Sequence, residues 1–182
     1  MTSAEIEYGA TEVVKGLFAA CTSLTYVKIP ETVTKIGNGS FGNTPALHEF
    51  DIPPSITEIE GLAFSPAGLT TIDIPATVTS IGNRAFNFCT LLSRATVHGV
   101  REFEDPIFTF VGSAPTNLPK TPALTDIAFP DMTKEQVWAL QQNAKIVYAQ
   151  SARVTEDLTI TFHCSDGDFT ATGREDWTAT GV

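Results

Sequence analysis

The sequence predicts a mainly β solenoid built from stacked coils of about 23 residues, closed by a short capping helix and a C-terminal β-hairpin. Four phenylalanines and four leucines recur at nearly constant spacing. They are Phe18, Phe41, Phe64 and Phe86, separated by 23, 23 and 22 residues, and Leu24, Leu47, Leu69 and Leu92, separated by 23, 22 and 23. A single coil of this length cannot bury its apolar side chains, so neighbouring coils must stack to form a common core.

Two short strands and a turn are expected in every coil, as the segment Leu69–Cys89 (LTTIDIPATVTSIGNRAFNFC) illustrates best. In its T-I-D-I step, apolar and polar residues alternate with the period of a half-buried strand, and Pro75 ends that strand. The V-T-S-I step predicts a second strand, and the A-F-x-x-C step predicts a turn that places one phenylalanine in the core. Further columns repeat in the same register: Val27, Phe50, Ile72 and Ala95; Ile29, Ile52, Ile74 and Val97; Val33, Ile56 and Val78; Val13, Ile36, Ile59 and Ile81.

The ends of the repeat region differ from its middle. Ile6 precedes Ile29 by one repeat, so a worn first copy is expected near the N-terminus. After Val97 the register fails, and the stretch 98–123 contains four prolines, which disfavour regular strands. We therefore expect a proline-rich insertion loop there. Leu124–Pro130 then restores the strand and proline step.

The segment after Pro130 predicts a capping unit. Thr133 and Gln136 have the spacing of a capping box, which marks a helix start. Val137 and Leu140 give that helix one apolar face, and Asn143 is a suitable left-handed stop. A strand is expected over 145–148. Since the end of a solenoid has to be covered, we expect this unit to be the C-terminal cap.

A hairpin is predicted in the last segment of the chain. Apolar and polar residues alternate between Leu158 and Cys164, and Asp166-Gly167 supplies turn chemistry before Phe169. The run 165–168 could instead be half of a calcium loop, but the later oxygen ligands of such a loop are absent, which favours the turn. A lone hairpin is marginal in water, so it must dock on the solenoid, on another subunit or on a larger assembly. The expected organisation is a solenoid over 1–97, an insertion loop over 98–123, a last degenerate repeat with the capping helix over 124–150, and a hairpin with a tail over 151–182.

The recurring I-P, V-T-x-I-G and A-F-x-x-C steps resemble those of the BspA-like, or Treponema-type, leucine-rich repeat family. The resemblance covers about 11–97, with the degenerate copy over 124–130. It implies a leucine-rich repeat solenoid and a role in adhesion or recognition, with no particular ligand. In addition, the segment Leu158–Phe169 resembles the hairpin that ends some short proteins of this type encoded in phage and prophage tail regions.

The outward positions of the first strand form the candidate binding surface. In a leucine-rich repeat, the resemblance implies, these positions face the concave surface, where ligands commonly bind. They differ from coil to coil, unlike the core columns. One row is Tyr26, Glu49, Thr71 and Arg94, and the next is Lys28, Asp51, Asp73 and Thr96. The 98–123 loop and the C-terminal hairpin are the alternative surfaces.

No pattern of catalytic or metal-binding residues stands out, so we expect no enzyme, no cofactor and no metal. His48, His98 and His163 lie far apart in sequence and belong to no metalloprotease or nucleophile-elbow motif. Cys21 and Cys89 occupy the same position three coils apart, roughly 14 Å at about 4.8 Å per coil, which is beyond disulfide reach. We expect both thiols to be buried as small apolar groups, and Cys164 to pack inward. Thr11, Thr34, Thr57 and Thr79 form an outward column on the second strand, where β-branched residues suit a solvated surface.

The charge limits the classes of partner. The chain has 11 basic and 21 acidic residues, a net charge of −10, which argues against nucleic acids and anionic membranes. The first residues lack the features of a signal peptide, and no apolar run is long enough to enter a membrane. Residues 153–182 carry two basic and six acidic residues, a net charge of −4, which marks the C-terminal segment for a basic surface on a partner.

Three functions are consistent with the sequence. The first is a non-catalytic recognition or adhesion module that binds a protein or glycan on a host or bacterial surface. The second is a structural or receptor-binding component of a bacteriophage virion, in contact with other virion proteins, to which the hairpin resemblance points. The third is an accessory domain of an enzyme. The expected location is therefore extracellular, on a bacterial surface or in a virion, and the C-terminal hairpin could also join copies of the chain into a homo-oligomer.

Overall fold

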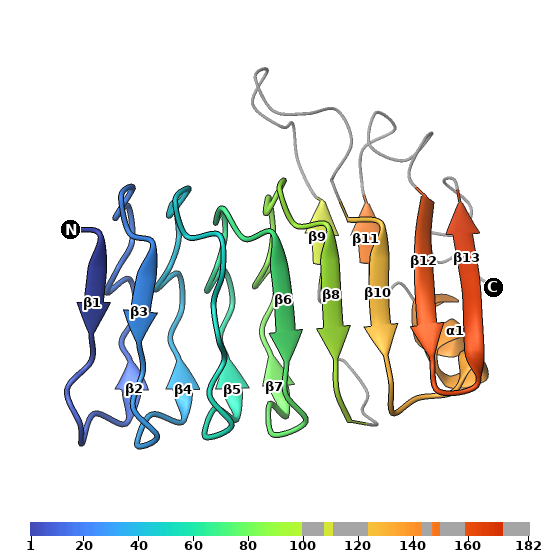
Figure 1. Cartoon of the computed structure of the whole chain (residues 1–182), viewed down its shortest axis with the longest axis horizontal. Helices are drawn as coiled ribbons and strands as arrows, with labels where there is room; N and C mark the ends of the chain where they lie inside the picture. The colour runs from blue at the N-terminus through green and yellow to red at the C-terminus, as the bar shows by residue number, and fades with distance from the viewer. Residues whose placement is uncertain (100–107, 111–123, 143–146, 150–158, 173–182) are drawn as a thin grey trace.

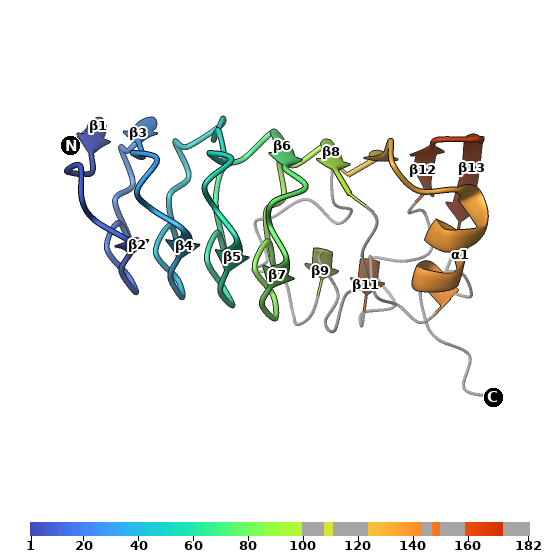
Figure 2. The same cartoon turned by 90° about the horizontal axis from the view of Figure 1, so that it is seen from below.

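The protein is a solenoid whose coils stack side by side along its longest axis (Figure 1). The computed structural model describes residues 1–99, 108–110, 124–142, 147–149 and 159–172. Each coil except the third contributes a longer strand to one side of the stack, and the coils of the N-terminal half contribute a two-residue strand to the opposite side (Figure 2). The longer strands are β1 (Ser3–Glu5), β3 (Tyr26–Lys28), β6 (Thr71–Ile74), β8 (Arg94–Val97), β10 (Asp126–Phe129) and β12 (Thr159–Cys164). The two-residue strands are β2 (Glu12–Val13), β4 (Lys35–Ile36), β5 (Glu58–Ile59) and β7 (Ser80–Ile81).

Parallel pairing between coils follows the register that the repeat predicts. β2, β4, β5 and β7 form one four-stranded sheet in this order, here called the short-strand sheet. On the other side, β6 and β8 pair with Ile72 opposite Ala95 and Ile74 opposite Val97. The predicted columns are therefore the inward-facing positions of neighbouring strands. The mainly β repeat fold is confirmed.

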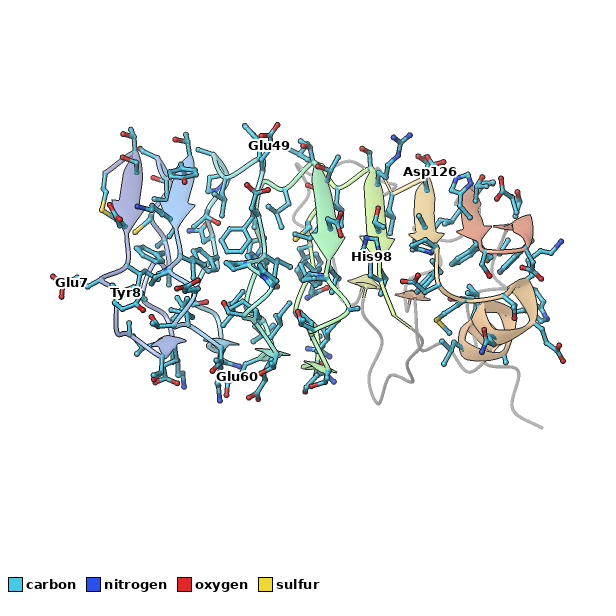
Figure 3. The ribbon with its side chains drawn as sticks, turned by 60° about the horizontal axis from the view of Figure 1, so that its bottom comes forward. Glu7, Tyr8, Glu49, Glu60, His98 and Asp126 are labelled. Atoms are coloured by element: carbon cyan, nitrogen blue, oxygen red, sulfur yellow. The ribbon has the colours of Figure 1, made fainter. Side chains whose placement is uncertain are left out.

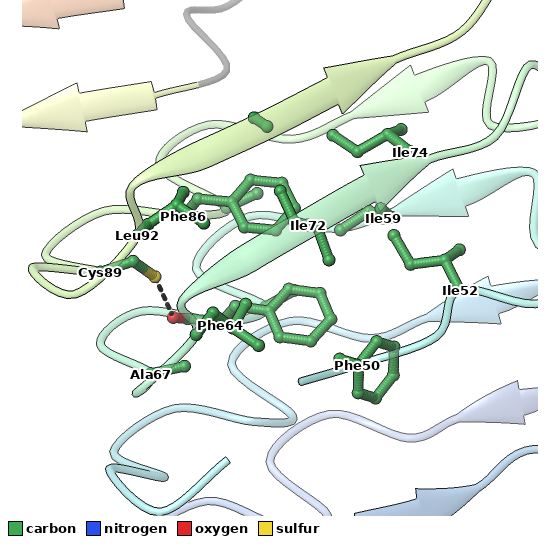
Figure 4. Close-up of a cluster of buried hydrophobic side chains, with 14 of the residues drawn as sticks. Phe50, Ile52, Ile59, Phe64, Ala67, Ile72, Ile74, Phe86, Cys89 and Leu92 are labelled. Carbon is green, nitrogen blue, oxygen red and sulfur yellow. Dashed lines mark hydrogen bonds between the residues drawn. The ribbon is translucent and has the colours of Figure 1, made fainter. Parts of the chain in front are cut away.

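The core is a stack of the repeated phenylalanines. Phe18, Phe41, Phe64 and Phe86 have successive ring centroids 5.3, 5.2 and 5.2 Å apart and nearly parallel planes. Figure 4 shows Phe64 and Phe86 of this stack beneath the aliphatic columns. All four rings are buried, and such stacking adds to the burial of their apolar surface. The expected turn does place one aromatic ring of each coil in the core.

Hydroxyl groups add a ladder to each side of the stack. The threonine column is exposed, as expected, and each hydroxyl donates to the backbone carbonyl of the threonine one coil earlier. The Oγ1 to O distances are 3.4 Å for Thr34, 3.3 Å for Thr57 and 3.2 Å for Thr79. On the other side, Ser93 Oγ reaches Thr70 O at 3.1 Å in the same way. These columns therefore bond coil to coil, which β propensity alone did not predict.

The prediction of a loop over 98–123 was wrong in one respect. The segment contains strand β9 (Phe108–Phe110), which pairs in parallel with β11 (Val147–Ala149). The flanking prolines conceal this strand in the sequence, and its partner lies about 40 residues away, where no local pattern points to it. The strand expected over 145–148 is observed at 147–149, and Asn143 lies outside the described residues.

The C-terminal hairpin docks on the solenoid, the first of the three expected alternatives. Strand β12 pairs in parallel with β10, and β13 (Gly167–Thr172) pairs antiparallel with β12, so the order β6-β8-β10-β12-β13 is one continuous sheet. Phe162 on β12 is completely buried. Helix α1 (Lys134–Gln142) contacts both hairpin strands. The hairpin is thus part of the cap, and the 124–150 unit does not close the solenoid alone.

Two caps start helix α1. The predicted capping box is present: Thr133 N donates to Gln136 Oε1 at 2.9 Å, and Gln136 N donates to Thr133 Oγ1 at 3.4 Å. Lys134 N donates to Asp166 Oδ1 at 2.7 Å, so the hairpin turn also satisfies a free N–H at the helix start. Asp166 therefore ties the hairpin to the helix. This observation supports the turn over the calcium loop.

The three cysteines are free thiols in different environments. Cys89 is buried as expected, its Sγ lies 3.1 Å from Phe64 O, and burial raises its pKa to about 12. Cys164 is half-buried, and burial raises its pKa to about 11. Cys21 is half-buried, not buried as predicted.

Candidate functional site: the long-strand face

The outer surface of the longer strands, here called the long-strand face, carries all the predicted site residues. Along each strand, outward side chains alternate with buried ones, as in β6, where Thr71 and Asp73 are exposed and Ile72 and Ile74 are buried. The eight predicted residues are exposed, except Thr96, which is half-buried: Tyr26, Lys28, Glu49, Asp51, Thr71, Asp73, Arg94 and Thr96. Figure 3 shows Glu49 and Asp126 on this face and Glu60 on the opposite side.

Strand pairing aligns part of the two predicted rows and extends them at both ends. Thr71 lies opposite Arg94, and Asp73 lies opposite Thr96. The rows continue at both ends through positions that had not been proposed: Ser3, Asp126 and Thr161 in the first row, and Glu5, Ala128 and His163 in the second. Asp126 could have been found from the sequence by extending the outward rows to the degenerate repeat at 124–130.

The hydrogen-bonded sheet is interrupted at the third coil. Strands β1 and β3 form a separate two-stranded sheet, and on this side of the stack the segment Glu49–Pro53 contributes an isolated bridge, Asp51 with Asp73, in place of a strand. Within this segment, Phe50 occupies the column that holds Val27, Ile72 and Ala95 in other coils. Its ring packs edge-on against Phe41 and Phe64, with both centroid distances 4.9 Å. The interruption thus lies at the coil whose column position holds the largest side chain.

Two hollows flank the interruption. The first, of about 240 Å³, lies between β3 and the segment Glu49–Pro53 and is lined by Tyr26, Lys28, Glu49 and Asp51, among others. The second, of about 460 Å³, lies on the other side of that segment. It is lined by Phe50, Asp51, Ile52, Asp73, Pro75, Ala76, His98 and Asp131. The two hollows share Phe50 and Asp51 as lining residues, and together they are called the groove around the third coil here.

The face neutralises many of its own carboxylates, but not those at the interruption. Lys28 Nζ lies 2.6 Å from Glu5 Oε1, and this contact raises the pKa of Lys28. Asp126 lies near Arg94 and contacts His163. In contrast, neither Glu49 nor Asp51 forms a salt bridge with any residue that the structure describes. The groove therefore has a surplus of negative charge.

Two histidines, distant in sequence, each lie between carboxylates of neighbouring coils. The Nε2 of His163 is 3.0 Å from Asp126 Oδ1, and its Nδ1 is 3.0 Å from Asp168 Oδ2. The hydrogen bond to Asp126 raises the pKa of His163 and lowers that of Asp126, because it favours the charged forms of both. His98 lies 3.2 Å from Asp73 and 3.6 Å from Asp131. Sequence reasoning had treated these histidines as isolated, since their partners are 5 to 37 residues away without a fixed spacing.

A further hollow lies at the capped end, near the hairpin that was an alternative surface. It has a volume of about 430 Å³ and is lined by Lys134, Glu135, Trp138, Phe169 and Thr170. The rings of Trp138 and Phe169 meet edge to face at 5.4 Å. Elsewhere in the described ranges, no three His, Cys, Asp or Glu side chains converge into a group that could hold a metal ion. No described helix has the length and hydropathy needed to cross a bilayer.

These features agree with a match to a known family. The family model for the BspA type leucine rich repeat region matches residues 2–135 in six copies. The chain belongs to the BspA-type leucine-rich repeat family. The match begins before the region in which the repeat was recognised from the sequence and ends inside helix α1, so the worn first copy and the degenerate repeat are members of the same series.

Two of the three solved structures described next share the fold of this BspA-type protein. The pneumococcal vaccine antigen PcpA superposes with a TM-score of 0.61 and 20% identity over 84% of the chain, which spans 37% of PcpA. A leucine-rich repeat protein from Bacteroides ovatus gives a TM-score of 0.50 and 22% identity over 85% of the chain, which spans 38% of that protein. A leucine rich cell surface protein from Faecalibacterium prausnitzii is 23% identical over 85% of the chain, which spans 56% of it, with a TM-score of 0.43. No curated protein sequence matches the chain significantly.

Proposed function

We propose that this BspA-type protein is a non-catalytic recognition or adhesion module that binds a protein or glycan partner through its long-strand face. The observation that carries the proposal is the groove around the third coil. Packing between repeats explains why the apolar columns are buried. It does not explain why the surface has a groove beside Glu49 and Asp51, which form no salt bridge with the described residues. Surface grooves of this kind are where partners bind.

The family and the fold similarity support the proposal and its location outside a cell. BspA-type repeats resemble proteins of adhesion and recognition, and PcpA, whose fold is similar, is a bacterial vaccine antigen. On these grounds we place the protein on a bacterial surface. The short-strand sheet is a less suitable surface, because Lys35 Nζ there lies 2.6 Å from Glu60 and 3.6 Å from Glu58, so both carboxylates already have a cationic partner.

The phage-virion alternative depends on the resemblance of Leu158–Phe169 to hairpins of tail proteins. One argument for it was that a lone hairpin needs a partner in a larger assembly. Since β12 pairs with β10 of the same chain, that argument no longer applies. The alternative of an enzyme's accessory domain has no observation of its own.

A pair of matched variants tests the proposed face. Thr71→Arg places a large cation in the middle of the long-strand face, and Thr57→Arg places the same group on the short-strand sheet. Both proteins would be screened by surface plasmon resonance against matrix proteins, mucins and a glycan array, after thermal unfolding has shown that both are folded. We expect Thr71→Arg to reduce binding of whichever partner the unmodified protein captures and Thr57→Arg to leave it unchanged. Equal effects of both variants would contradict the proposal.

A further inference from the structure

The groove around the third coil combines an apolar floor with a negatively charged rim. Phe50 and Ile52 each keep 8% of their surface exposed, and Pro75 and Ala76 continue the apolar lining. Asp51, Asp73 and Asp131 lie at the edge of the same hollow, where His98 is the one basic residue among those that line it. An apolar floor beside carboxylates fits an occupant with an apolar stem and a cationic end.

An exposed aromatic ring lies on the other side of the segment. Tyr26 lines the first hollow with 56% of its surface exposed, next to Glu49 and Asp51. Lys28 also lines this hollow, but its ammonium group is held by Glu5. A guanidinium or ammonium group can bind over an aromatic ring while it pairs with a carboxylate. Each hollow therefore places an apolar or aromatic surface next to carboxylates, and Asp51 lines both.

We infer that the groove docks a basic segment of a protein partner, with an arginine or lysine side chain lying on Phe50 and its charged end between Asp51 and the neighbouring carboxylates. This inference rests on the proposed function and specifies the partner's chemistry. The charge of the groove selects this occupant. Glu5, Asp126 and Asp168 on the same face already contact a lysine or a histidine, whereas Glu49 and Asp51 have no such contact within the described chain. Long cationic side chains bury their methylene groups along apolar surface in this manner.

A peptide-binding experiment with charge-matched variants tests the inference. The probe is a fluorescein-labelled peptide of alternating glycine and arginine, and an alternating glycine and glutamate peptide serves as the negative probe. The site variant is Glu49→Gln with Asp51→Asn. The control is Glu7→Gln with Glu12→Gln, which removes two exposed carboxylates from the first coil, Glu12 being in β2 of the short-strand sheet. Figure 3 shows Glu7 away from Glu49. Both variants have a net charge of −10 + 2 = −8, so general electrostatic attraction is equal.

Fluorescence polarisation should show about a tenfold loss of affinity for the arginine peptide in the site variant, and less than a twofold loss in the control. Tyr26→Ala should also weaken binding, whereas Tyr8→Ala, which removes another exposed tyrosine, should not. Equal losses in the two double variants would show that only net charge matters and would overturn the inference. So would an unmodified protein that does not distinguish the arginine peptide from the glutamate peptide.

Failure of this inference can be separated from failure of the proposed function. If Thr71→Arg abolishes capture of a partner while the arginine peptide binds without discrimination, the face binds a partner of other chemistry, such as a glycan. If neither Thr71→Arg nor the site variant changes any binding, the long-strand face is not the binding surface.

Discussion

The body of the solenoid over 11–97 and its closing end, described over 124–142 and 159–172, are stabilised in different ways. In the body, identical side chains stack on their equivalents in the next coil, as the phenylalanine column shows. At the closing end, unlike elements meet, and polar contacts join them: Asp166 caps helix α1, and His163 bridges β10 and β13. In the body, the same side-chain contact is repeated from coil to coil. The end of the solenoid instead requires contacts between residues that occur only there.

The largest effect is expected from a break in the body. Phe64→Ala removes the ring between Phe41 and Phe86 and leaves a cavity in a fully buried position. We expect the free energy of unfolding to fall by about 3 to 5 kcal/mol, measured by urea denaturation. A loss below about 1 kcal/mol would show that neighbouring coils collapse into the space and that the stack is less rigid than its geometry indicates.

A smaller effect is expected at the closing end, from Asp166→Ala. The substitution removes the carboxylate that accepts a hydrogen bond from Lys134 N, while the capping box of Thr133 and Gln136 remains. We expect a loss of about 1 kcal/mol, the usual cost of a helix cap. Ser165→Ala, at the exposed position directly before Asp166, leaves this cap intact and serves as the control in the same urea titration. If Asp166→Ala cost as much as Phe64→Ala, the division between body and end would not hold.

The stability of the closing end should also depend on pH. The raised pKa of His163 means that its contribution to stability is complete below about pH 6.5 and is lost as the pH rises through the folded-state pKa. The lowered pKa of Asp126 means that its contribution is present above about pH 3.8 and is lost as the pH falls through the folded-state pKa. Stability from this pair is therefore greatest between these limits.

Two measurements check this pH dependence. An NMR titration of the imidazole protons should give His163 a midpoint above that of a model peptide. The variant His163→Gln should flatten the decline in unfolding free energy on the alkaline side, whereas His48→Gln should not. An unshifted midpoint for His163 would mean that its contacts with Asp126 and Asp168 do not persist in solution.

The smallest effect is expected from Lys28→Gln on the long-strand face. The substitution removes the ion pair with Glu5, but both side chains are more than 60% exposed, and solvent screens such pairs. We expect no resolvable change in unfolding free energy by urea denaturation. A clear loss of unfolding free energy would show that exposed ion pairs stabilise the body, so that the body and the end would not differ in this respect.

The site was only partly predictable from the sequence. Strand alternation identified its outward rows correctly, including Asp51 and Asp73, which form a bridge between coils. The groove was not predicted, although Phe50 was visible as the largest residue of its column. The column pattern gives the size of each side chain. It does not describe the space around that side chain, which decides how the neighbouring strands pair. The histidine bridges were missed for a related reason, because nothing in the sequence links His163 to Asp126.

The features that repeat could be predicted from the sequence: the coil length, the inward columns, the exposed rows and the family. These features arise from contacts between equivalent residues at a constant separation, so periodicity is sufficient to find them. The positions at which the repetition stops could be identified only in the three-dimensional structure. In that structure, β9 pairs with β11, the sheet continues through β12 and β13, and it is interrupted beside Phe50. Each of these depends on residues without a fixed spacing, whose contacts are set by how the surrounding coils pack in three dimensions.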